Sequence, residues 1–236
     1  MNRLKRDIKQ AFKAPAPVKK EEFLSTLPVK EMSAAEFVIS QAGYVRKVTW
    51  LLFALIVILI AGSPFMLKEE AIWFISGLMP ILALLAVSEN SKSERYNMAE
   101  LEASARFSLR SVLLARMVLL GGVNLAALLI AAPIGIWVGE YLAPVTGLFI
   151  VTPFFLSSAI GLYIVRKVKG QAAVYPLTAE SFFISVLVLI SRNNLDRYLA
   201  PETLKIWVAA AAVSLAAMVV QGIAYVKSTE EMTWSW

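Results

Sequence analysis

The chain has 236 residues, of which 58% are hydrophobic and 17% charged, and its formal net charge is +6. Soluble domains are on average about half apolar and about a quarter charged, so this composition indicates a membrane protein. Cys and His are both absent. Disulfides, most transition-metal sites and every mechanism that needs a Cys or His base or nucleophile are therefore excluded. We expect no metal, no cofactor and no catalytic residue, and so not an enzyme.

Residues 1–47 are predicted to form a cytoplasmic N-terminal region. Within residues 1–13, three apolar side chains fall on one helical face among Lys and Arg: Leu4, Ile8 and Phe12. This pattern fits a basic amphipathic helix on an anionic membrane face, and it equally fits a disordered basic tail. Ser33 and Glu36 have the spacing of a capping box, which predicts a second helix. Its composition is typical of a helix that lies in the membrane interface and leads into the first span.

Six apolar runs, each long enough to cross a bilayer, follow in a domain predicted at 48–226. Their predicted bounds are 48–67, 71–88, 112–138, 144–165, 174–190 and 206–226. The fold class is therefore an all-α membrane protein with six transmembrane helices and a tail at 227–236. Gly121, Gly122 and Pro133 predict a kink or an interruption in span three. Gly135 and Gly139 have a spacing typical of close helix packing.

The charges of the connecting segments predict the orientation. With the N-terminus inside, 19 of the 23 Lys and Arg residues fall on the inner side. The outer segments hold the remaining four: Lys68, Arg192, Arg197 and Lys205. Because positive residues concentrate in cytoplasmic loops, both termini are expected in the cytoplasm. We expect a multi-pass protein of the plasma membrane, with membrane lipids rather than nucleic acid as the partner of its positive charge.

The longest polar interval between two spans is 89–116, and the orientation places it in the cytoplasm. Glu102, Arg106 and Arg110 recur every four residues there, and Glu102 precedes Arg106 in the favourable order for a helical ion pair. The spacing predicts a cytoplasmic helix at about 91–110. Apolar stripes beside the charged one suit a helix held between the membrane and a protein partner. A solvated connecting helix with ordinary salt bridges has the same pattern.

Around this interval the chain resembles the six-span permeases of ABC-2 type transporters. The resemblance rests on the topology of the whole chain and on a short set of residues in the interval: Glu94-Arg95, Glu100-Leu101-Glu102, Ala103-Ser104, Ser108 and Arg116. Those permeases have an N-terminal interfacial helix and a cytoplasmic coupling helix between spans two and three. One departure is that the segment 191–205 is short, where the family often has a membrane-dipping hairpin. The segment 193–199 suits one small helical turn, and an outer-gate or substrate-lid role is in doubt.

The resemblance implies that this chain forms a transport path and that a separate ATPase subunit docks on the coupling helix. The residues implied in docking are Glu94, Arg95, Glu100, Glu102 and Arg106. The sequence lacks the GxxxxGK[ST] phosphate loop, in agreement with an ATPase on another chain. A second permease, identical or related, is also expected. The expected function is then ATP-driven export of a peptide, a drug or a lipid-like solute.

Two polar residues within the predicted spans are candidates for a transport path. Asn124 lies in span three, and Glu180 lies in the first turns of span five. Polar and ionisable residues inside a membrane are costly and often functional. Asn124 also fits a simple hydrogen bond to a neighbouring helix, and Glu180 fits a wet position paired with Arg166 or Lys167. These residues keep a secondary transporter or channel open as an alternative. A non-transporting regulator or scaffold is a further alternative.

Overall fold

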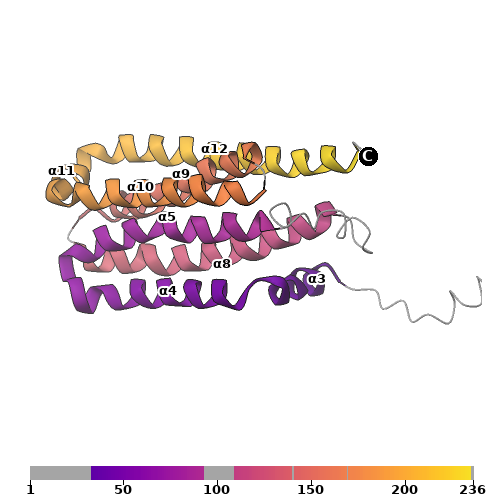
Figure 1. Cartoon of the computed structure of the whole chain (residues 1–236). Coiled ribbons are helices and arrows are strands. Elements are labelled where there is room, and N and C mark those ends of the chain that lie inside the picture. Colours follow the sequence, from indigo (N-terminus) through magenta and orange to yellow (C-terminus); the bar gives the residue numbers. More distant parts are fainter. Residues whose placement is uncertain (1–32, 93–108, 140, 169, 235–236) are drawn as a thin grey trace, which may run out of the picture. The chain divides into compact units, whose positions relative to one another are not determined.

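The computed structural model describes residues 33–92, 109–139, 141–168 and 170–234, and the elements assigned within these ranges are all helices. Contacts divide the chain into two compact units, Met1–Ala34 and Ala35–Trp236. The second unit holds six long helices that lie side by side (Figure 1). They are α4 (Lys47–Leu67), α5 (Ala71–Asn90), α8 (Leu109–Val138), α9 (Ala143–Lys167), α10 (Val174–Ile190) and α12 (Leu204–Trp234).

All six helices are long and apolar enough to cross a membrane, which confirms the six predicted spans. The bounds of α10 are those predicted, and α12 remains helical beyond residue 226. Span three was predicted to have a kink or an interruption. The interruption is wrong, because α8 is one continuous helix of 30 residues, and the kink stays a prediction. An apolar surrounding offers the backbone no other hydrogen-bond partner, so Gly121 and Gly122 remain helical. Pro133 lies near the end of α8, where few turns are affected.

Short connections join consecutive helices. The turn between α4 and α5 is the 3₁₀ helix η2 (Lys68–Glu70), as predicted. Between α10 and α12 the chain forms η4 (Ser191–Asn194), the single turn α11 (Leu195–Tyr198) and η5 (Pro201–Thr203). The small helical turn predicted at 193–199 corresponds to α11, and two further short helices flank it. The link between α9 and α10 contains η3 (Gly170–Ala173).

A short helix precedes α4, near the position of the capping box. It forms α3 (Ala34–Ser40) followed by η1 (Gln41–Tyr44). The Trp50 indole N–H of α4 donates to the Ala42 carbonyl oxygen at 3.3 Å, which holds η1 against the beginning of α4. The location of α3 in a membrane interface stays a prediction.

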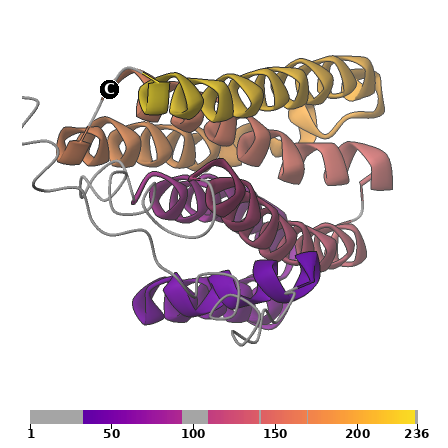
Figure 2. The ribbon, with the colours of Figure 1, turned by 90° about the vertical axis from the view of Figure 1, so that its right-hand side faces the viewer.

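Helices α5 and α9 form the centre of the bundle. In each of them 61% of the apolar stretch is buried, against 17% to 28% in the other four helices. They pack against each other, and both contact α8 and α10, while α4 packs on α5 and α12 on α9. Figures 1 and 2 accordingly show α5 between α4 and α9, and α9 between α5 and α12. Two helices are thus enclosed by protein, and four form the perimeter.

The perimeter helices expose large apolar side chains along their length. Examples are Leu51 and Ile58 of α4, Leu129 of α8, Phe183 of α10 and Val213 of α12, each at least 64% exposed. A surface of this kind is unfavourable in water over such an extent. Such a surface suits contact with lipid tails. In that surrounding the backbone polar groups must be hydrogen-bonded within the protein. The arrangement supports a multi-pass membrane protein.

Small residues allow three close helix contacts in the core. A Cβ atom at Gly135 of α8 would overlap the side chain of Ile150 in α9. One at Gly139 would lie 2.6 Å from Ile72 Cδ1 in α5, and one at Gly161 of α9 would lie 3.0 Å from Leu177 Cδ1 in α10. The predicted packing role of Gly135 and Gly139 is confirmed.

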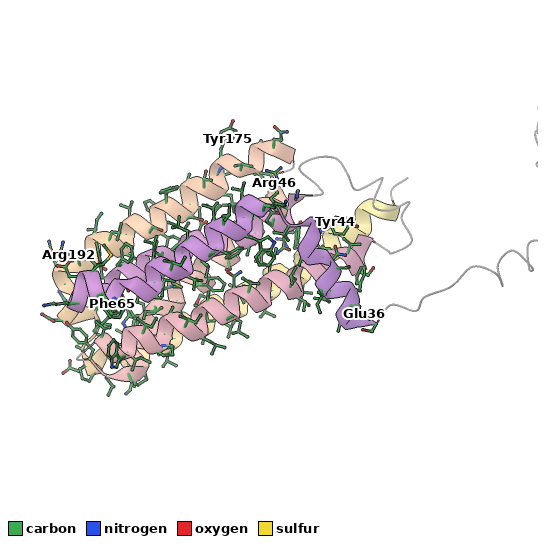
Figure 3. All side chains as sticks on the ribbon, turned by 90° about the horizontal axis from the view of Figure 1, so that it is seen from below. Glu36, Tyr44, Arg46, Phe65, Tyr175 and Arg192 are labelled. Atoms are coloured by element: carbon green, nitrogen blue, oxygen red, sulfur yellow. The ribbon has the colours of Figure 1, made fainter. Side chains whose placement is uncertain are left out.

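Polar contacts tie the helices together at the end of the bundle predicted to be outside. Glu70 forms an ion pair with Arg192, and the Trp73 indole N–H donates to the Leu189 carbonyl oxygen at 2.8 Å. These contacts join the α4–α5 hairpin to α10. Figure 3 shows Phe65 and Arg192 at this end, and Tyr44 and Arg46 at the opposite end.

Candidate functional site

The predicted docking residues lie outside the described part of the chain. This applies to all five of them: Glu94, Arg95, Glu100, Glu102 and Arg106. The two ends of the interval 89–116 are described, however, because α5 runs to Asn90 and α8 begins at Leu109. The structure therefore shows how the interval is attached to the bundle.

The first attachment is the carboxylate of Glu89, at the end of α5. This residue is 7% exposed, and its Oε1 accepts a hydrogen bond of 2.7 Å from the Thr49 hydroxyl of α4. Its Oε2 lies 3.9 Å from Lys92 Nζ, and that ammonium group also donates to the Tyr44 carbonyl oxygen at 3.1 Å. One buried carboxylate thus links the beginning of the polar interval to α4 and, through Lys92, to η1.

The second attachment joins the interval to α12. The Tyr225 hydroxyl donates to the Asn90 carbonyl oxygen at 3.3 Å, and Tyr225 is 1% exposed. Asn90 and Ser91 are buried as well. Three consecutive polar residues, Glu89 to Ser91, are therefore enclosed by protein before the undescribed segment 93–108 begins.

A small apolar cluster lies beneath these polar contacts. It combines Val87 of α5, Leu113 of α8 and Tyr225 of α12 with three residues of α9 and α10: Leu162, Val165 and Leu177. Val87 precedes the segment 93–108 and Leu113 follows it. Because both residues belong to one cluster, a displacement at either end of the segment would disturb the packing of the five helices that contribute to it.

The second candidate region is around Glu180 of α10, a partly exposed residue. Glu180 Oε2 accepts hydrogen bonds from Ser157 of α9 at 3.3 Å and from Ser181 at 3.1 Å. Ser157 is also 3.5 Å from the Pro80 carbonyl oxygen of α5. Pro80 and Ser157 lie near the middle of their helices, so the carboxyl group is far from either end. The predicted pairing with Arg166 or Lys167 is wrong, because α10 turns Glu180 toward these serines.

Asn124 of α8 is 2% exposed, and its Oδ1 atom has no hydrogen-bond partner among the described residues. The structure does not bring it together with Glu180, whose hydrogen bonds go to α9 and to its own helix. Asn124 and Glu180 therefore make no direct hydrogen bond that would join them in one transport path.

Sequence reasoning missed the residues that attach the interval to the bundle and those that surround Glu180. The signal for the first group was present in part, since Glu89 and Asn90 follow directly on an apolar run. Serines scattered through apolar runs were the signal for the second group. Their partners depend on helix rotation, which one sequence does not determine.

No known protein family, curated protein or solved structure matches this chain. The site is therefore interpreted from its own residues and geometry.

Proposed function

We propose that this protein is the membrane-spanning permease subunit of an ATP-driven ABC transporter. A separate ATPase subunit docks on the interval 89–116, and a second permease, identical or related, completes the transport path. The exported solute is a peptide, a drug or a lipid-like molecule. The protein lies in the plasma membrane with both termini in the cytoplasm.

The observation that carries this proposal is the attachment of the interval 89–116, the docking interval, to the helix bundle. Glu89 binds Thr49 of α4, and the Asn90 carbonyl oxygen accepts from Tyr225 of α12. A force applied to the segment 93–108 would therefore act directly on the first and last spans. A solvated connecting loop needs no buried carboxylate at its beginning, because burial of such a group is costly. A device that transmits motion does need a firm attachment.

Three further features support the proposal. The chain resembles ABC-2 permeases in topology and in the residues of the interval. It lacks a phosphate loop, so ATP hydrolysis would fall to a partner. Its six helices form a bundle whose centre is occupied by α5 and α9, packed against each other, and this suits a path that a second copy completes.

The test is affinity purification of the tagged chain from the membranes of cells that produce it naturally. We expect an ATPase subunit with a phosphate loop to purify with it. The double substitution of Glu100→Ala and Glu102→Ala should reduce that subunit severalfold and leave membrane insertion unchanged.

The matched control is Glu202→Ala, because Glu202 is exposed at the opposite end of the bundle. Its substitution should leave the recovered ATPase unchanged. Recovery of no ATPase with the unmodified protein would overturn the proposal, and equal recovery with the double variant would remove the docking role of the two glutamates.

A further inference from the structure

A buried polar cluster surrounds Glu180 between α5, α9 and α10, away from the docking interval. Its hydroxyl groups belong to Ser157 and Ser181, which are 2% and 0% exposed. Ser157 and Ser181 lie 3.3 Å apart, and both bond to Glu180 Oε2. Glu180 Oε1 is buried and has no hydrogen-bond partner among the described residues.

The cluster contains too few protons for an ionised carboxylate. Each serine hydroxyl supplies one proton. The Ser157 proton is shared among the Pro80 carbonyl oxygen, Glu180 Oε2 and Ser181 Oγ, and the Ser181 proton between Glu180 Oε2 and the Leu177 carbonyl oxygen. Oε1 receives none. A buried charged oxygen without a donor is strongly unfavourable.

No positive group compensates the charge within the described residues. The elements with the most extensive contacts to α10 are α5, α9, η3 and η4. Their charged residues are Glu89, Arg166, Lys167 and Arg192. Glu89 and Arg166 each lie nine residues beyond the residue that reaches the cluster, about 13 Å along the helix. Lys167 is one residue farther, Arg192 is engaged by Glu70 at the far end of α10, and the only other titratable group of α10, Tyr175, is 78% exposed.

We propose that Glu180 binds a proton, so that its carboxyl group is neutral while α5, α9 and α10 are packed together. A proton needs no additional space, whereas a metal ion would need room beside Oε1, which solvent does not reach. One carboxylate also cannot balance a divalent cation. Separation of α10 from α9 would admit water to Oε1 and release the proton. The cluster is then a proton-binding site whose occupancy follows the packing of the bundle. This inference is independent of the ATPase proposal.

The test is infrared spectroscopy of the purified protein in lipid vesicles at neutral pH. We compare the unmodified chain with Glu180→Gln and, as the matched control, Glu202→Gln. The carbonyl stretch of a protonated carboxyl group should be present in the unmodified protein, absent from Glu180→Gln and retained in Glu202→Gln. Glu180→Asp should shift this band, which provides a second readout if Glu180→Gln does not fold. A Glu180 signal found only among ionised carboxylate stretches would overturn the proposal.

Discussion

Serine hydroxyls bond to backbone carbonyl groups that prolines leave without a donor. Pro153 lacks an N–H, so the Phe149 carbonyl oxygen of α9 has no partner within its helix. Ser76 of α5 donates to that oxygen at 3.0 Å. In α4, Pro64 similarly frees the Ile60 carbonyl oxygen, to which Ser63 donates at 2.7 Å. Prolines are thus tolerated inside apolar helices because a nearby hydroxyl replaces the missing donor.

Substitution of Ser76 by Ala tests whether its hydroxyl takes the place of the N–H donor that Pro153 lacks. We expect the free energy of unfolding in micelles to fall by about 1 kcal/mol, because the Phe149 carbonyl oxygen loses its donor in an apolar surrounding. The matched control is Ser214→Ala. Ser214 is also buried and donates to Ala211, four residues before Leu215, which has its own N–H. Equal losses in the two variants would contradict the explanation.

At the scale of helices, close packing depends on which glycines face a neighbour. Gly135 of α8 faces Ile150, which is fully buried in α9. Gly121 of the same helix is exposed, and a Cβ atom added there would meet no atom of a neighbouring helix within 4 Å. The spacing of Gly135 and Gly139 marks Gly135 in the sequence, and the rotation of α8 then determines that Gly135 faces a neighbouring helix and Gly121 does not.

The pair of substitutions Gly135→Ala and Gly121→Ala should therefore have opposite effects. Gly135→Ala forces Ile150 to move and should destabilise the bundle by about 1–3 kcal/mol. Gly121→Ala should stabilise α8 by up to about 1 kcal/mol, because Ala favours a helix over Gly. Thermal unfolding in detergent measures both. A gain in stability with Gly135→Ala would show that α8 and α9 do not approach closely at this residue.

For the whole molecule, the orientation in the membrane decides what the interval 89–116 can contact. The chain has no Cys, so a single introduced Cys can be labelled without background. Lys167→Cys, at the end of α9, should be protected from an impermeant thiol reagent in intact cells. Glu202→Cys, in η5, should react. The opposite pattern would place the interval outside and remove any contact with a cytoplasmic ATPase.

The six spans were predictable because their length and apolar composition alone define them. The short turn at Lys68–Glu70 followed from the spans on either side. The partners of Glu180 were not predictable, since the depth and rotation of α10 relative to α9 decide between Ser157 and the basic end of α9. The attachment of Glu89 to Thr49 likewise depends on the packing of α4 against α5. The predicted docking residues themselves lie outside the described residues and stay predictions.

The most direct measurement of the central claim is photo-crosslinking from the docking interval in living cells. A photo-reactive amino acid replaces Glu100 in one variant and Glu202 in another. We predict a covalent product between residue 100 and an ATPase subunit that contains a phosphate loop, and no such product from residue 202. Products from residue 100 that contain only a signalling or transcription protein, or no ATPase at all, would contradict the claim.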